Sequence, residues 1–155
     1  MKTHDINAVE EALKTQESAA FLTSGASMRP LLRTHKDIVV IKRAKHPLQV
    51  GDVPLYKKQG VNKLILHRII GMREDGVYIV RGDNTYHKEY IPQSDVVGVM
   101  SAIYRGGKYI DCNSSKSYRI YVSLNRFFYP VRWLWKTKIR ATLGKIKRKF
   151  VGKKV

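Results

Sequence analysis

The sequence contains one cysteine, no long hydrophobic run, and no acidic residue after Asp111. The single cysteine, Cys112, excludes an intrachain disulfide framework and a metal cage built from cysteines alone. No stretch approaches the roughly 18 apolar residues that cross a bilayer, and the polar first residues lack the apolar core of a signal peptide. We therefore expect a protein made without export, located in the cytoplasm or peripherally on the cytoplasmic face of a membrane.

Ligand spacings typical of metal sites are also missing from the sequence. The histidines outside the strand candidates, at His4, His35, His46 and His87, form no recognisable pattern with acidic residues or with Cys112. We expect these histidines to lie at the surface, Cys112 to be a structural thiol, and the protein to need no metal ion and no cofactor.

Positive charge is concentrated at the C-terminal end. The chain has 155 residues and a net charge of +18, and 13 positive residues with no acidic one follow Asp111, so the first 111 residues carry only +5. Such an excess implies an anionic partner, either acidic lipid or nucleic acid. We expect an N-terminal helical segment (residues 1–20), a β domain (21–112) and a basic tail (113–155).

Helical spacing near the N-terminus gives way to a series of short strands. Ile6, Val9 and Leu13 recur at three- and four-residue steps, which predicts a helix over residues 5–17. Six β-branched runs separated by glycine turns then predict the strands 37–42, 53–57, 63–70, 76–81, 96–104 and 108–111. Short strands with tight connections indicate a mostly β fold, an antiparallel sheet or partial barrel.

The basic tail has the pattern of an amphipathic helix. Pro130 is placed to open it, and apolar residues then recur at three- and four-residue steps as far as Phe150. The residues expected to contact a membrane or another anionic surface are Trp133, Trp135, Arg132, Lys136 and Arg140. A tail that is disordered, or that packs on the β domain, remains an alternative, and nucleic acid is the less favoured anionic partner.

Three separate segments carry residues that could perform acyl transfer. Ser27 lies in the glycine-flanked turn 24–30, which can expose a hydroxyl beside backbone N–H groups. His67 lies in an apolar run, where desolvation keeps an imidazole neutral and able to act as a base. Asp83 follows a strand and could orient that base, and Glu89 is a second acid nearby. Taken singly, each segment is more often an ordinary turn or a core histidine.

The order of these segments resembles the motif boxes of the signal peptidase clan, which comprises type I signal peptidases and self-cleaving repressor proteases. The matching boxes span about residues 22–105 and are Ser24–Pro30, Gly51–Val53, His67–Gly71, Gly82–Asn84 and Val96–Gly98. Histidine at position 67, where bacterial signal peptidases have lysine, makes the chain more similar to the endoplasmic-reticulum and archaeal branch.

The resemblance implies a mostly β serine endopeptidase of the signal peptidase type. Ser27 would be the nucleophile and would contribute its main-chain N–H to an oxyanion hole, His67 would be the general base, and Asp83 the third member of the triad. Glu89 matches a second acid of that branch, and the substrate would be a peptide or protein precursor.

Two departures from the clan change the expected role. The absence of a membrane-spanning anchor favours a membrane-associated maturation protease, with the basic tail replacing the anchor at the interface. The absence of an Ala-Gly dipeptide and of the base lysine disfavours self-cleavage. The alternative function is a non-catalytic basic module that binds anionic lipid or nucleic acid.

Overall fold

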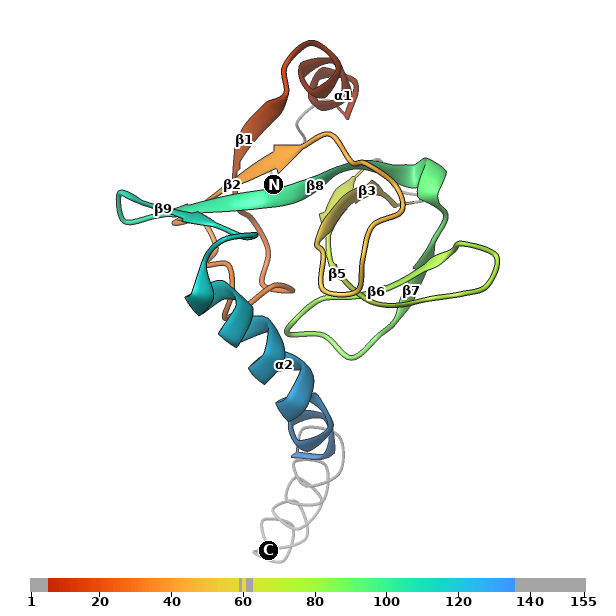
Figure 1. The fold of residues 1–155 in the computed structure, drawn as a ribbon, viewed down its shortest axis with the longest axis vertical. Coiled ribbons are helices and arrows are strands. Elements are labelled where there is room, and N and C mark those ends of the chain that lie inside the picture. Colours follow the sequence, from red (N-terminus) through yellow and green to blue (C-terminus); the bar gives the residue numbers. More distant parts are fainter. Residues whose placement is uncertain (1–5, 59, 61–62, 136–155) are drawn as a thin grey trace, which may run out of the picture. The chain divides into compact units, whose positions relative to one another are not determined.

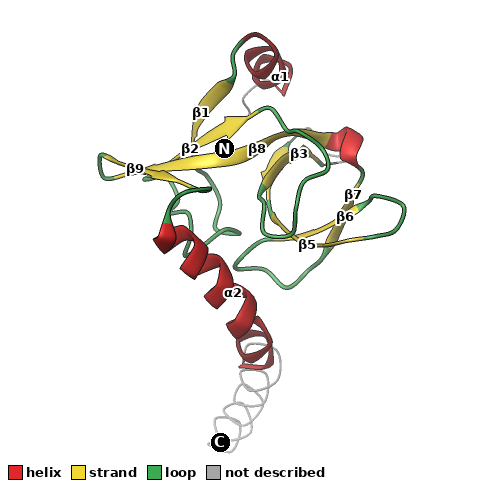
Figure 2. Cartoon of the chain, in the orientation of Figure 1, coloured by secondary structure: helices red, strands yellow, loops and turns green. Residues whose placement is uncertain are grey.

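The computed structural model describes residues 6–58, 60 and 63–135 of the chain. Two helices flank a succession of short strands (Figure 2). The elements are α1 (Ile6–Thr15), β1 (Ser18–Leu22), β2 (Ile38–Lys42), β3 (Pro54–Lys57), β4 (Leu64–Leu66), β5 (Arg68–Met72), β6 (Tyr78–Arg81), β7 (Glu89–Ile91), η1 (Gln93–Asp95), β8 (Val96–Arg105), β9 (Lys108–Asp111) and α2 (Lys116–Leu134). The prediction of a mostly β fold, an antiparallel sheet or partial barrel with a helix near each end, is confirmed, and the antiparallel sheet curls into a half-barrel.

The larger sheet is built around β8, its longest strand. The strand order is β1-β2-β8-β3-β4, with β9 also paired to β8, and every pair is antiparallel (Figure 1). Along β2, the residues Val39, Val40 and Ile41 are all buried. Because successive strand side chains point to opposite faces, consecutive burial means that both faces of this part of the sheet are covered.

The smaller sheet has the order β5-β6-β7, again antiparallel. The single strand predicted over residues 63–70 is wrong in this respect: β4 pairs with β3 in the larger sheet, whereas β5 pairs with β6 in the smaller one. His67 is the residue between β4 and β5. The chain therefore passes from one sheet to the other at the predicted general base.

Three further elements differ from the sequence prediction. The strands β1 and β7 were not predicted, since their sequences, Ser-Ala-Ala-Phe-Leu and Glu-Tyr-Ile, are too short or too poor in β-branched residues to signal a strand. Pro130 does not open a helix but lies inside α2, which begins at Lys116. A proline inside a helix removes one backbone hydrogen bond, and the sequence-based prediction treated that as a helix boundary.

Residues from both sheets form one hydrophobic cluster. Its buried members come from β3, β5, β6, β7 and the segment before β3, and are Leu48, Tyr56, Ile69, Tyr78, Val80 and Ile91. Burying such side chains stabilises a fold by about 1.5–3 kcal/mol each before entropy costs are counted. Tyr56 is part of this cluster, and its hydroxyl also reaches the candidate site described below.

The chain divides into two compact units, Met1–Arg119 and Ile120–Val155. Both sheets belong to the first unit, together with the opening turn of α2. The rest of α2 belongs to the second unit, in which the structure describes residues 120–135. Among the described helices, none is long and apolar enough to cross a membrane.

Candidate active site

Ser27 lies in the long loop that joins β1 to β2. Gly25 has φ +80°, a left-handed conformation that side chains disfavour, and its carbonyl accepts a hydrogen bond of 2.6 Å from the Thr34 hydroxyl. After Ser27 the backbone closes a helical turn in which the Leu32 N–H donates to the Met28 carbonyl over 3.0 Å. These contacts shape the tight turn that the sequence predicted.

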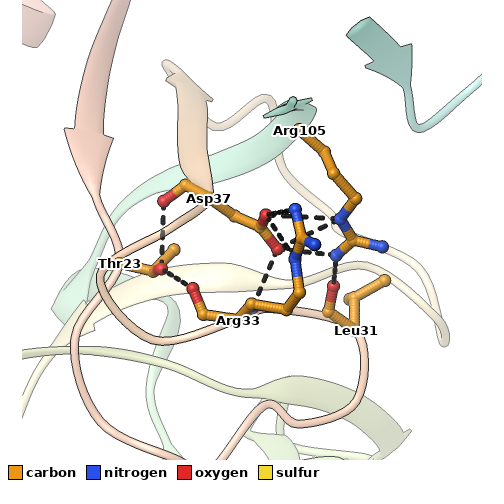
Figure 3. A network of polar contacts seen from close by, with 5 residues as sticks. All are labelled: Thr23, Leu31, Arg33, Asp37 and Arg105. Carbon is orange, nitrogen blue, oxygen red and sulfur yellow. Dashed lines mark hydrogen bonds and ion pairs between the residues drawn. The ribbon is translucent and has the colours of Figure 1, made fainter. Parts of the chain in front are cut away.

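A buried carboxylate ties the two ends of this loop together. Asp37, fully buried, accepts hydrogen bonds from the side chains of Arg33 and Arg105, and its carbonyl accepts from the Thr23 hydroxyl over 3.0 Å (Figure 3). Arg105 also donates to the Leu31 carbonyl. Burial alone would raise the pKa of Asp37, but the hydrogen bonds from Arg105 and Arg33 outweigh it and lower the pKa to about 2. Asp37 therefore stays ionised and anchors the loop that carries Ser27.

The Gly-Asp-Asn turn after β6 holds Ser27 directly. The Asn84 N–H donates to the Ser27 carbonyl over 2.7 Å, and the Asn84 side chain donates to the Ala26 carbonyl over 3.2 Å. A Cβ placed on Gly82 would lie only 2.7 Å from that Ser27 carbonyl oxygen. Glycine at position 82 is therefore required for the two turns to approach this closely.

His67 is placed at the sheet crossover with its ring largely shielded from water. The residue is 7% exposed, and its Nδ1 lies 3.0 Å from the Tyr56 hydroxyl oxygen. Burial lowers the pKa of His67 from its ordinary value, and nearby Lys58 acts in the same direction, whereas Glu89 and Asp83 oppose the shift. A neutral imidazole near pH 7 is the form that a general base needs.

Glu89 lies close to both His67 and the Tyr56 hydroxyl. Its Oε2 accepts a hydrogen bond from that hydroxyl and lies 3.8 Å from His67 Nδ1, and its Oε1 lies 2.8 Å from Lys58 Nζ. Burial alone would raise the pKa of Glu89, but the hydrogen bonds from Lys58 and Tyr56 lower it. Glu89 is therefore an ionised carboxylate close to the His67 ring.

Asp83 is engaged in a buried ion pair. Its two oxygens accept from Arg68 Nε and Nη2 over 2.8 and 2.7 Å, and both side chains are almost completely buried. Arg68 also donates to the Gly51 carbonyl over 2.7 Å and to the Tyr118 hydroxyl over 3.2 Å. The orienting role expected of Asp83 stays a prediction. Arg68 competes with His67 for the Asp83 carboxylate, because it donates to both of its oxygens.

A cleft of about 370 Å³ brings the predicted nucleophile and base together. Ser27 and His67 both line it, as does Glu89, although they come from the β1–β2 loop, the β4–β5 junction and β7. The rest of the lining is mostly apolar: Met28, Leu32, Leu55, Leu64, Ile65 and Leu66, with Thr23, Ser24, Gly25, Lys58 and Thr85. The arrangement can accept an extended, partly apolar ligand beside a hydroxyl and an imidazole.

Cys112 and the metal-ligating residue types are also candidate functional groups in the described part of the chain. Cys112 is a buried free cysteine, and burial raises the pKa of its thiol to about 11, which makes it a poor nucleophile. Across residues 6–58, 60 and 63–135, no cluster of three or more histidine, cysteine, aspartate or glutamate side chains could hold a metal ion.

The described tail residues lie on two sides of α2. Trp135 is 60% exposed and continues an apolar stripe formed by Ile120, Leu124, Phe127, Phe128, Val131 and Leu134, all exposed. Trp133 is also exposed but, at 100° per residue, falls away from that stripe. Arg132 donates to the Asn125 side chain over 2.9 Å. Lys136 and Arg140, the other expected contacts, lie outside the described residues.

The polar residues that surround His67 were missed by the sequence analysis. Tyr56 lies in β3, Lys58 comes directly after the last residue of that strand, and Arg68 comes directly after His67. A tyrosine in an apolar strand predicts a core position, which Tyr56 also occupies, so nothing in the pattern indicated its hydroxyl contact. The adjacency of Arg68 to His67 was the one available signal.

Comparison of the chain with protein-family models and with curated proteins found no match.

Proposed function

We propose that this chain is a serine endopeptidase of the signal peptidase type, acting on a peptide or protein precursor. The observation that carries the proposal is the shared cleft: Ser27 lines it on a turn clamped by Asn84, and His67 lines it as a buried, neutral imidazole. The resemblance in motif order adds the reaction class, since the same residues match the nucleophile and base of that clan.

The proposed reaction is acyl transfer in two steps. His67 removes the proton of the Ser27 hydroxyl as its oxygen attacks the scissile carbonyl, and the resulting oxyanion accepts from the Ser27 main-chain N–H. His67 then gives the proton to the leaving amine, so that the peptide C–N bond breaks and an ester to Ser27 remains. Water, deprotonated by His67, hydrolyses that ester and restores the serine hydroxyl.

The cleft lining and a strand edge support an extended peptide as substrate. β4 is the last strand in the order of the larger sheet, and Leu64, Ile65 and Leu66 of β4 all line the cleft. A peptide added along that edge would gain main-chain hydrogen bonds, with alternate side chains entering apolar space. We propose small or apolar residues next to the scissile bond.

Substitution of the nucleophile and base tests the proposal. A library of quenched fluorescent peptides is incubated with the full chain, and cleaved members are identified by mass spectrometry. Ser27→Ala and His67→Ala are each expected to reduce kcat/KM by roughly 1,000-fold or more. Ser94→Ala is the matched control, because it removes an exposed serine hydroxyl on η1, outside the cleft. Cleavage that persists in both site variants excludes this mechanism.

We also propose that the C-terminal helix associates with an anionic membrane surface. Supporting this, the apolar stripe that runs along α2 from Ile120 to Leu134 and continues at Trp135 is exposed, with Arg126 and Arg132 on either flank. A surface of this kind suits the boundary between acyl chains and lipid phosphates. With that association, the chain would act as a membrane-associated maturation protease.

A further inference from the structure

The Tyr56 hydroxyl contacts both His67 and the Glu89 carboxylate. Its oxygen lies 3.0 Å from His67 Nδ1, and it donates to Glu89 Oε2. The Tyr56 side chain is 1% exposed and packs in the hydrophobic cluster with Ile69 and Tyr78. Because the ring is packed in this cluster, the hydroxyl oxygen is held beside His67 Nδ1 and Glu89 Oε2.

Counting protons determines the direction of these hydrogen bonds. Burial and the Glu89 carboxylate raise the pKa of Tyr56, so the hydroxyl keeps its single proton, and that proton goes to ionised Glu89. The Tyr56 oxygen can then only accept from His67. Nδ1 of a neutral His67 must therefore carry the ring proton, which leaves the lone pair on Nε2.

We propose that Glu89, acting through the Tyr56 hydroxyl, positions His67 and selects the tautomer whose Nε2 is free to accept the Ser27 proton. This inference rests on the proposed function and assigns Tyr56 and Glu89 as positioning residues. It differs from the triad expected from the sequence, because the link to the acid passes through a tyrosine and the acid is Glu89.

The distribution of charge around His67 favours Glu89 over Asp83 in this role. The Asp83 carboxylate accepts two hydrogen bonds from buried Arg68, whose positive charge offsets it. Glu89 is paired with Lys58, whose side chain is 43% exposed and therefore better screened by water. When His67 becomes an imidazolium during turnover, the Glu89 carboxylate 3.8 Å away stabilises it.

The tautomer is measured directly by ¹⁵N NMR of histidine-labelled full-length protein, with the His67 signals assigned by their loss in His67→Gln. Above the pKa of His67, the wild type is expected to show a protonated Nδ1 and an unprotonated Nε2. Tyr56→Phe is expected to shift the ring toward the Nε2–H form. An unprotonated Nδ1 in the wild type overturns the proposal, and this measurement requires no substrate and uses a variant only to assign the signals.

Tyr78→Phe is the matched control for the loss of the hydroxyl. Tyr78 is fully buried like Tyr56, and its hydroxyl likewise lies near a histidine, 3.1 Å from His46 Nδ1, but it does not line the cleft. The His67 signals should be unchanged in this variant. If Tyr78→Phe alters the His67 tautomer as much as Tyr56→Phe does, the effect is general destabilisation and the proposal fails.

We call the contacts from Glu89 through the Tyr56 hydroxyl to His67 the relay. Glu89→Gln removes the negative charge of the relay while keeping the shape of the side chain. The pKa of His67, followed by the same NMR signals, is expected to fall because a stabilising negative charge is lost. Glu10→Gln is the control, since Glu10 pairs with Lys57 at 2.6 Å and is about as exposed as Glu89, 27% against 25%. An unchanged pKa in Glu89→Gln contradicts the relay.

Kinetics separate the relay from the proposed function. On a cleaved peptide, Tyr56→Phe is expected to lower kcat about 10- to 100-fold with little change in KM, since general-base efficiency falls while the cleft lining remains. Unchanged kcat in Tyr56→Phe overturns the relay and leaves the peptidase proposal standing. Conversely, the NMR results can be as expected while the Ser27→Ala variant retains full activity. That outcome overturns the peptidase proposal and leaves the tautomer assignment intact.

Discussion

The N–H of Asn84 donates to the carbonyl oxygen of Ser27 over 2.7 Å, joining two turns that are far apart in the sequence. This single bond is made possible by Gly82, because any larger residue would meet the same carbonyl oxygen. The Ser-Gly-Ala-Ser and Gly-Asp-Asn segments are therefore complementary halves of one structural unit, which presents Ser27 to the cleft.

Gly82→Ala is expected to separate these two turns. The new Cβ would lie 3.0 Å from the Ser27 Cβ and 2.9 Å from the Thr85 hydroxyl, so the serine turn must move. We expect a loss of stability of about 1–3 kcal/mol, typical of overpacking, and a fall in kcat/KM of roughly 10-fold or more from displacement of Ser27, the proposed nucleophile. Gly71→Ala is the control, since its Cβ would make ordinary contacts at 3.6 Å with Ile79. Equal effects of the two substitutions on kcat/KM would contradict the conclusion that the Gly82 turn positions Ser27.

Asp37→Asn is expected to destabilise the loop that carries Ser27. The pKa of Asp37 is lowered from 3.8 to about 2, so its ionised form contributes about 2 kcal/mol of stability at neutral pH. Because the pKa is lowered on folding, that contribution is present above pH 3.8 and is lost as the pH falls through about 2. Urea unfolding at pH 7 should therefore give a larger free energy of unfolding for the wild type than for the variant. The difference between the two free energies should shrink in strong acid.

Asp75→Asn provides the comparison for Asp37→Asn. Asp75 also pairs with an arginine, Arg73 at 3.0 Å, but both side chains are at least half exposed. Exposed pairs contribute about 0–1 kcal/mol, so Asp75→Asn should change the free energy of unfolding little at any pH. A change as large as that of Asp37→Asn would show that burial of the pair is not the source of its stability.

Lys58→Met is expected to raise the pH at which the proposed peptidase becomes active. Lys58 helps to lower the pKa of His67 and also offsets the Glu89 charge, so its removal raises the pKa of His67 on both counts. The acidic limb of the kcat/KM profile, which reports ionisation of the free enzyme, should move to higher pH. Lys57→Met, which removes the neighbouring partner of Glu10, should leave the limb in place. A limb that moves to lower pH in Lys58→Met would contradict the role given to His67.

Asp83→Asn is expected to lower the stability of the fold strongly, because Asp83 is one partner of a buried ion pair. Removing one partner of a buried ion pair typically costs about 3–5 kcal/mol, because the other charge stays buried. Urea unfolding should show such a loss in Asp83→Asn and a smaller loss in the double variant Arg68→Met/Asp83→Leu, which removes both charges. A variant with wild-type stability but strongly reduced kcat would instead support the orienting role predicted from the sequence.

Charges introduced into the apolar stripe of α2 are expected to weaken membrane binding. Full-length protein is floated with vesicles of mixed phosphatidylcholine and phosphatidylserine. Leu124→Glu/Phe127→Glu should lower the bound fraction roughly 10-fold or more, since apolar burial and attraction to the anionic surface are both reduced. Met72→Glu, which alters an exposed apolar residue of β5, is the control. Binding to neutral vesicles that equals binding to anionic ones would contradict the proposal, as would preferential retention on duplex DNA.

Local sequence patterns were a good guide where short-range physics decides the structure. The helix from Ile6 follows from apolar spacing, and the strands β2, β6, β8 and β9 follow from β-branched runs between turn residues. The same reasoning failed at Pro130, where a local helix breaker is tolerated within α2. It also failed at β7, which is only three residues long.

The sequence by itself determined the antiparallel β character of the fold, the turns at Ser27 and Gly82, and the placing of positive charge at the C-terminal end, because these depend on neighbouring residues. Only the tertiary structure decided that β4 and β5 belong to different sheets, that Asp83 pairs with Arg68, and that Tyr56 links His67 to Glu89. Those contacts join residues from separate strands, and their geometry depends on how the sheets pack. No periodicity along the chain encodes that packing, and for this reason the hydroxyl of a core tyrosine could be recognised as part of the site only in three dimensions.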